Sequence, residues 1–205
     1  ARIREVESVV SLSTLLQNIA DAEQGPKTCA VFDFDGTIIS GYSATAFLKD
    51  QIARGEISPA DLVQLTQAAT RFGIGSLGFS ALMAVHAQYL AGRSEADYVA
   101  NSERLFRRAI AKLIYPEARQ LIKAHRAAGH SIAIISSATP YQVLPAARDL
   151  GIEHVYATDL EVEGGQFTGS VVQPTCFGIG KVHAAERFTA QQGSDLENCF
   201  FYSDS

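Results

Sequence analysis

Short apolar runs alternate with helical patterns along most of the chain. The apolar runs lie at residues 29–35, 131–135, 154–157 and 199–202. Runs of this length, bounded by turn residues, are typical of strands buried in a parallel sheet. The helical patterns lie at residues 116–128, 140–150 and 181–192, and each is followed by glycine. This alternation predicts an α/β fold with a doubly wound, Rossmann-like parallel sheet.

Three segments lie outside this alternation. Residues 3–20 have apolar side chains at helical spacing, which predicts an amphipathic helix within an N-terminal segment, 1–27. Residues 160–172 alternate with period two around Gly164-Gly165, which predicts a small β-hairpin. Residues 41–115 separate the first two strands, although a parallel crossover needs only about a dozen residues. We therefore expect a helical-bundle cap at 41–115, inserted into an α/β core of residues 28–40 and 116–205.

One stretch of the predicted cap has the length of a membrane span. Residues 72–92 contain no Asp, Glu, Lys or Arg. Glycines, serines, His86 and Gln88 lower the hydrophobicity of this stretch and interrupt its periodicity. Burial within the cap is therefore the favoured interpretation, and contact with lipid is the alternative.

Composition excludes several classes of protein. The net charge of −5 argues against a protein that binds nucleic acid through its phosphates, because such proteins need a basic face. Cys29, Cys176 and Cys199 are an odd number at wide spacing and predict neither a disulfide framework nor a zinc site. They favour a reducing, cytoplasmic compartment. No pattern of a signal peptide opens the chain.

Two carboxylates follow the first predicted strand directly, in the sequence Asp33-Phe34-Asp35-Gly36-Thr37. Alternate residues of an extended strand end face the same side, so Asp33 and Asp35 are expected to converge. The carboxyl ends of strands are where α/β sheets bind ligands. Two close acids repel unless a cation or a shared proton compensates, and oxygen ligands suit Mg²⁺. Two solvated loop aspartates are the alternative, but they would not explain the apolar strand that leads into both.

Further polar groups are predicted at the same edge of the sheet. Ser136 and Ser137 end the second strand and precede a helix, whose N-terminus favours phosphate. Lys181 opens the next helix, where a cation is unfavourable unless an anion lies nearby. Asp204 follows the last strand. Each residue has an ordinary structural explanation by itself, but their joint placement at one edge favours a catalytic site.

The order of these motifs resembles the haloacid dehalogenase-like (HAD) hydrolase superfamily. The resemblance rests on Asp-x-Asp-Gly-Thr after a first strand, Ser after a second, Lys, and a loop that carries Asp, and it covers residues 28–205. The helical insertion after the first motif is similar to the cap of the phosphoserine phosphatase-like branch, subfamily IB. The first motif is specific, whereas the others carry weight only in this order.

The resemblance implies a Mg²⁺-dependent phosphomonoester hydrolase that forms an aspartyl-phosphate. Asp33 would be the nucleophile, and Asp35 would protonate the leaving oxygen and then activate water. Mg²⁺ would be held by Asp33, Asp204 and the backbone carbonyl of Asp35. The residues implied to bind the phosphoryl group are Thr37, Ser136, Ser137 and Lys181. The substrate would be a small phosphorylated metabolite or a lipid precursor.

Two departures from the family pattern affect these expectations. Where phosphoserine-specific members have a glutamate for the substrate's amino group, this chain has Tyr42. An aromatic entrance suits a larger or less polar phosphomonoester, so phosphoserine phosphatase is kept as an alternative. The family's last motif also continues beyond Asp204 with another aspartate, a strand and a helix. We therefore expect a core truncated at its C-terminus, with a metal site that this chain completes only in part.

Residues 41–47, 115–117 and 136–139 resemble HAD domains fused ahead of a 1-acylglycerol-3-phosphate acyltransferase. An accessory domain of such a phospholipid-biosynthesis enzyme is thus an alternative function. Membrane contact would then come from an acyltransferase domain beyond Ser205 or from residues 72–92. A non-catalytic binding module is a further alternative, although the full set of acidic, Ser and Lys motifs argues against it. No oligomeric state is predicted.

Overall fold

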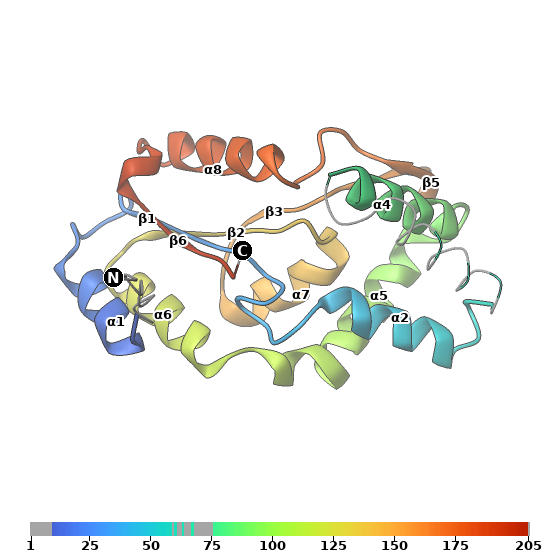
Figure 1. Cartoon of the computed structure of the whole chain (residues 1–205), viewed down its shortest axis with the longest axis horizontal. Helices are drawn as coiled ribbons and strands as arrows, with labels where there is room; N and C mark the ends of the chain where they lie inside the picture. Colours follow the sequence, from blue (N-terminus) through green and yellow to red (C-terminus); the bar gives the residue numbers. More distant parts are fainter. Residues whose placement is uncertain (1–9, 59, 61–62, 64–66, 68–75, 205) are drawn as a thin grey trace, which may run out of the picture.

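The computed structural model describes residues 10–58, 60, 63, 67 and 76–204. Four parallel strands form its main sheet in the order β3-β2-β1-β6 (Figure 1). These strands are β1 (Cys29–Phe32), β2 (Ser131–Ile135), β3 (His154–Tyr156) and β6 (Cys199–Tyr202). The doubly wound α/β class predicted from the sequence is confirmed.

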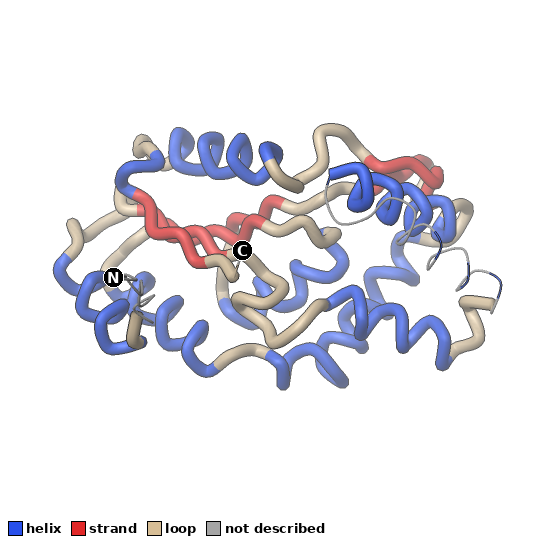
Figure 2. Tube along the Cα trace, viewed as in Figure 1, coloured by secondary structure: helices blue, strands red, loops and turns tan. Residues whose placement is uncertain are grey.

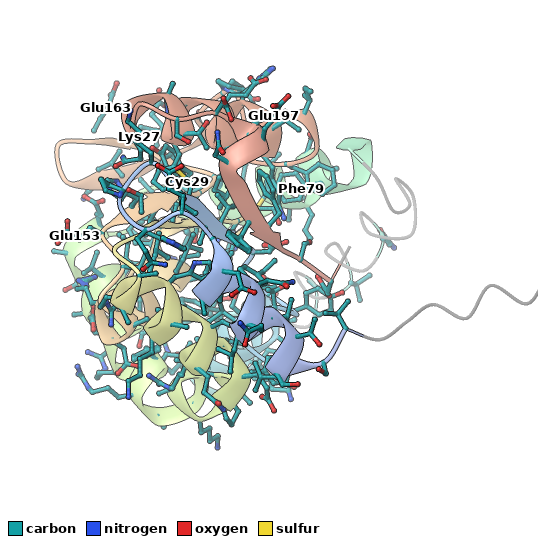
Figure 3. All side chains as sticks on the ribbon, turned by 90° about the vertical axis from the view of Figure 1, so that its left-hand side faces the viewer. Lys27, Cys29, Phe79, Glu153, Glu163 and Glu197 are labelled. Atoms are coloured by element: carbon teal, nitrogen blue, oxygen red, sulfur yellow. The ribbon has the colours of Figure 1, made fainter. Side chains whose placement is uncertain are left out.

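Helices cover both faces of this sheet (Figures 1 and 2). One face packs on α8, and the other packs on α1, α6 and α7. In Figure 3, α8 lies on one side of the strands and α1 and α6 lie on the other, with the labelled Cys29 beneath α8. The bounds are α1 (Leu12–Asp21), α6 (Pro116–Ala127), α7 (Pro140–Leu150) and α8 (Ile179–Gln191), with η3 (Leu196–Asn198) before β6.

Side chains of β1 alternate between these two layers. Cys29 and Val31 belong to the cluster that contains Phe188 of α8. Ala30 and Phe32 belong to the larger cluster on the opposite face. Because all four residues are buried, the strand is apolar at every position and shows no period-two pattern.

The described helices between residues 41 and 105 lie beyond the carboxyl ends of the strands (Figure 1). We call residues 41–115 the helical insertion. Met83, Ala87 and Leu90 on one of its helices are buried in the large cluster. One side of this helix is thus buried, whereas its Leu82 is 42% exposed, so the described part of 72–92 is buried only in part. Its described elements are α2 (Ser43–Ala53), α4 (Ser76–Leu90), α5 (Glu95–Leu105), η1 (Phe106–Ile110) and η2 (Ala111–Leu113).

The predicted hairpin forms and attaches to the helical insertion. It consists of β4 (Leu160–Glu163) and β5 (Gln166–Val171), and both glycines of its turn have positive φ, 57° and 79°. The N–H of Gly92 donates to the carbonyl of Phe167 at 2.8 Å, and the N–H of Phe167 donates to the carbonyl of Arg93 at 3.0 Å. The hairpin therefore connects the core to the turn between α4 and α5.

Two expectations change in the structure. The N-terminal helix begins at Leu12 and not at residue 3, because the Ser11 hydroxyl caps it by accepting from the Thr14 N–H at 3.2 Å; the first nine residues lie outside the described part. The first strand ends at Phe32, before both aspartates. Residues 72–75 also lie outside the described part, and within it no helix is long and apolar enough to cross a bilayer. The three cysteines are free thiols, as predicted.

Two buried histidines connect β6 to the rest of the core. His125 Nε2 lies 2.8 Å from the Tyr202 hydroxyl, and His125 Nδ1 lies 2.8 Å from His130 Nδ1. His130 Nε2 lies 3.1 Å from the carbonyl of Glu23. The carbonyl can only accept, so His130 donates from Nε2, and the proton between the rings then belongs to His125. Both rings are neutral in this arrangement, and every hydrogen bond is satisfied.

This pair predicts that acid destabilises the fold. Burial, with a smaller effect of His130, lowers the pKa of His125 from 6.5 to about 4. Between these values the unfolded chain binds the proton and the folded chain does not. The neutral His125 therefore makes its full contribution to the free energy of unfolding above pH 6.5. This contribution, about 3 kcal/mol, is lost as the pH falls from 6.5 towards 4. His125→Gln should reduce the difference in unfolding free energy between pH 7 and pH 4 by that amount, as measured by urea titration. The exposed His183→Gln is the control, and an equal effect in both variants would contradict the prediction.

Candidate active site

A tight turn after β1 brings its two aspartates to the edge of the sheet. The N–H of Asp33 still donates to the carbonyl of Tyr202 at 2.9 Å, which extends the pairing with β6 by one residue. The carbonyl of Phe34 then accepts from the N–H groups of Thr37, Ile38 and Ile39 at 3.4, 2.9 and 3.1 Å. Asp33 is therefore placed by the extended end of the strand and Asp35 by this turn, whereas we had expected the alternation of one strand to place both.

Asp33 forms an ion pair with Lys181 near the start of α8. The same carboxylate accepts a hydrogen bond from the N–H of Phe34 at 2.7 Å. The two side chains are 12% and 29% exposed, respectively, so both charges are partly removed from water. Lys181 is the third residue of its helix, and Asp33 supplies the anion that a cation at this position was predicted to need.

Asp35 is held by the first residue of α2. The N–H of Ser43 donates to Oδ1 at 2.6 Å, and its hydroxyl donates to Oδ2 at 3.2 Å. Burial raises the pKa of the Asp35 carboxyl, and the charge of Asp33 acts in the same direction. The hydrogen bonds from Ser43 and the charge of Lys181 oppose this rise in pKa. The two aspartates thus differ in environment: one is ion-paired, and the other is favoured as a proton carrier.

Asp204 lies against the turn at Gly36, which has φ 75°. A Cβ atom at Gly36 would lie 2.1 Å from Oδ2 of Asp204, so the close approach requires glycine. Figure 1 shows the end of the chain beside the loop that follows β1. The third predicted carboxylate is therefore adjacent to the Asp33–Asp35 turn.

The strand register places the remaining predicted residues at the same edge. Phe32 pairs with Ile134 and with Tyr202, so Ser136 and Asp204 each lie two residues beyond a partner of Phe32. Ser136 is fully buried, and its hydroxyl accepts from the N–H of Ala138 at 3.1 Å. No hydrogen bond joins Ser136 or its half-buried neighbour Ser137 to the aspartates among the described residues. The hydroxyl of Thr37 is buried without a hydrogen-bond partner in the same part of the chain.

One aromatic side chain lies next to Ser43 in the sequence, and one aromatic pair joins the helical insertion to the core. Tyr42 precedes the residue that binds Asp35, and it is 68% exposed. Phe79 of α4 stacks on Phe177 with ring centroids 4.3 Å apart, which joins the helical insertion to the loop before α8. No sequence pattern predicts this aromatic pair, because its two members are 98 residues apart and neither lies in a motif.

Ser43, which holds Asp35, and Gln142, which bonds to Ser43, were also missed. Ser43 and Gln142 lie in no chemical motif, although Thr139 and Gln142 have the spacing of a helix capping box. That pattern predicts the start of α7. It does not predict that the glutamine reaches Ser43, because the contact depends on how the helical insertion docks.

The chemistry of the donors fits a hard divalent cation. Asp33, Asp204 and the backbone of the turn offer only oxygen, which Mg²⁺ prefers while it keeps several waters. Among the described residues, no group of three Asp, Glu, His or Cys side chains is placed to hold a metal by itself. A site made of the Asp33 and Asp204 carboxylates, one backbone carbonyl and water is consistent with that finding. The close approach of Asp204 to Gly36 places the second of these carboxylates at the turn.

Comparison with known proteins identifies the family. The model of the haloacid dehalogenase-like hydrolase family matches residues 30–205. The chain belongs to this family. It is 32% identical over 182 residues to a probable phosphatase of Mycobacterium tuberculosis, covering 87% of this chain and 63% of that protein. It is 34% identical over 181 residues to a phosphoserine phosphatase of the same organism, covering 86% of this chain and 58% of that protein.

A solved structure supports the assignment of the fold. A phosphoserine phosphatase determined as an analogue of its phospho-aspartyl intermediate superposes with a TM-score of 0.60. It shares 22% sequence identity, and the match covers 86% of this chain and 77% of that chain. The HAD chain described here spans about six-tenths of the length of the curated relatives given above.

The turn at Gly36 provides a test of the metal site. Gly36→Ala should cost about 1 kcal/mol from its positive φ and should displace the Asp204 carboxylate. Gly92→Ala is the matched control, because its φ is 77° and nothing lies within 4 Å of the new Cβ. Both variants should unfold at similar urea concentrations, whereas Mg²⁺ affinity, measured by calorimetry, should fall at least about tenfold only in Gly36→Ala. Equal Mg²⁺ affinity in the two variants would argue against this site.

Proposed function

We propose that this protein is a Mg²⁺-dependent phosphomonoester hydrolase that acts on a small organic phosphate through an aspartyl-phosphate. The observation that carries the proposal is the Asp33–Lys181 ion pair beside the half-buried Asp35. It combines a nucleophile, a cation for the phosphoryl oxygens and a proton carrier at one edge of the sheet. Family membership and two phosphatase-named relatives support the same reaction class.

In the first step, an oxygen of Asp33 bonds to phosphorus as the bond from phosphorus to the alcohol oxygen breaks. Asp35 gives its proton to that oxygen, for which its raised pKa suits it. In the second step, Asp35 takes a proton from water, and the water oxygen displaces Asp33 from phosphorus. Inorganic phosphate leaves, and both carboxylates return to their starting states.

The phosphoryl group would be held by Lys181 and by groups at the ends of the strands. The buried hydroxyl of Thr37 has no partner among the described residues, and a phosphoryl oxygen would satisfy it. The region of Ser136 and Ser137 at the start of α7 supplies further donors. Mg²⁺ held by Asp33, Asp204 and the Asp35 carbonyl would offset the negative charge of the phosphoryl group when bound.

The surroundings of the site favour a less polar substrate than phosphoserine. By resemblance to phosphoserine-specific members of the family, Tyr42 occupies the position of an acidic residue that would meet a substrate ammonium group, and its side chain is 68% exposed. An exposed aromatic ring at that position favours apolar or aromatic phosphomonoesters. The relative named phosphoserine phosphatase keeps phosphoserine as the second candidate substrate.

The mechanism predicts that Asp33→Asn abolishes phosphate release, because an amide cannot attack phosphorus as a carboxylate does. Turnover by the full-length natural protein with Mg²⁺ should fall by at least about 10³-fold, measured as released phosphate. Asp149→Asn changes a surface aspartate paired with Arg119 and is expected to keep full activity. Undiminished turnover by Asp33→Asn would contradict the mechanism.

The proposed substrate class predicts a preference for apolar or aromatic phosphomonoesters over phosphoserine, and Tyr42→Glu should shift this preference towards phosphoserine. The natural protein should hydrolyse lysophosphatidate or an aromatic phosphomonoester with a higher kcat/KM than phosphoserine, in a panel that includes sugar phosphates. A glutamate at position 42 would pair with the ammonium group and should improve phosphoserine roughly 10- to 100-fold relative to the others. A natural protein that already prefers phosphoserine would favour the second candidate.

Two other functions give different results in the same assays. An accessory domain of an acyltransferase would leave acyl transfer to lysophosphatidate unchanged when Asp33 is replaced by Asn. A binding module without catalysis would bind phosphate and release none. The intact pairing of Asp33 with Lys181 argues against the binding module, since a non-catalytic site has no need for a desolvated carboxylate and ammonium beside a second acid.

A further inference from the structure

Both carboxylate oxygens of Asp35 are held by Ser43. The N–H of Ser43 donates to one oxygen at 2.6 Å, and the hydroxyl donates to the other at 3.2 Å. Ser43 is fully buried and is the first residue of α2, where N–H groups have no partner within the helix. The helical insertion therefore begins with a residue that fixes the orientation of Asp35.

The direction of the Ser43 hydroxyl is set by Gln142 of α7. The side-chain amide nitrogen of Gln142 lies 3.1 Å from Ser43 Oγ. An amide NH₂ group only donates, so the hydroxyl oxygen accepts there and its single proton remains for Asp35. Without Gln142, the hydroxyl could rotate away from the carboxylate.

The orientation of Gln142 is itself fixed by Thr139. The amide oxygen of Gln142 accepts from the N–H of Thr139 at 2.8 Å and from its hydroxyl at 2.9 Å. A reversed amide would place its NH₂ group against the backbone N–H, which is unfavourable. Thr139 and Gln142 are 1% and 8% exposed, so water does not replace these contacts readily. The hydrogen-bonded series Thr139–Gln142–Ser43–Asp35 thus passes from α7 through the helical insertion to Asp35, and its bonds up to Ser43 are buried.

We propose that Gln142 is a positioning residue that acts through Ser43 to aim the Asp35 carboxyl group at the leaving oxygen of the substrate. This inference rests on the proposed function, in which Asp35 carries the proton. Gln142 touches neither Asp33 nor Asp35 directly, so its effect passes through one hydroxyl group. The hydrogen bond from Gln142 to Ser43 joins α7 to α2, the first helix of the insertion. The orientation of the Asp35 carboxyl group therefore depends on the packing of these two helices against each other.

The inference predicts a dependence on the leaving group. An alkyl phosphate needs a proton at its leaving oxygen, whereas p-nitrophenol departs as a stable anion and needs little help. In Gln142→Leu, the first-turnover release of alcohol from an alkyl phosphate should slow at least about tenfold. The burst of p-nitrophenol from p-nitrophenyl phosphate should change less than about threefold, and KM for both should be nearly constant. Equal slowing for the two substrates, or none, would overturn the proposal.

A double-mutant cycle separates positioning from helix capping. Because Gln142 acts through the Ser43 hydroxyl, Ser43→Ala and the double variant with Gln142→Leu should show the same rate on the alkyl phosphate. Ser43→Thr keeps the hydroxyl and should restore most of the rate. Additive losses in the double variant would mean that Gln142 has only its capping role. Ser94→Ala removes the cap of another helix, at the start of α5, and should leave the dependence on the leaving group unchanged.

One further variant distinguishes failure of this inference from failure of the proposed function. Asp35→Asn should abolish release of alcohol from the alkyl phosphate and impair p-nitrophenol release less. If Asp35→Asn behaves in this way and Gln142→Leu resembles the natural protein, the positioning role alone is wrong. If Asp35→Asn leaves both substrates unaffected, the role of Asp35 in the proposed function is wrong. Urea unfolding of each variant confirms that the fold is retained.

Discussion

The pairing of Asp33 with Lys181 is the interaction on which the site depends. It joins the end of β1 to the start of α8, two elements 148 residues apart in the sequence. Removing a carboxylate and an ammonium group from water is unfavourable unless each compensates the other. The pair therefore constrains how α8 packs on the sheet, and it holds a cation beside the carboxylate that a phosphoryl group would approach.

At the same edge of the sheet, the Asp35 carboxyl group lies in a different electrostatic environment from that of Asp33. Its turn is closed by the Phe34 carbonyl, and its carboxylate is held from the helical insertion rather than from the core. One acid is thereby paired with a cation, while burial favours the proton on the other. Two aspartates separated by one residue can then perform different tasks in one reaction.

Much of this could be predicted from the sequence, because strands buried on both faces leave continuous apolar runs and helix ends carry Pro, Ser and Gly. The bounds of β2, β6 and α7 agree with the prediction. The start of α1 was wrong because Ser11 was overlooked as a cap. Contacts that cross between units, such as Gln142 to Ser43 and Phe79 to Phe177, could not be predicted, since docking creates them and no local pattern records it.

The central claim is that Asp33 becomes covalently phosphorylated, and acid quenching during turnover of a labelled phosphomonoester tests it most directly. The tryptic peptide of residues 28–49 should carry the phosphoryl group. Reduction with borohydride should then convert Asp33, and not Asp35, to homoserine, as detected by mass spectrometry. Phosphate release without label on this peptide, or with label on another residue, would contradict the account.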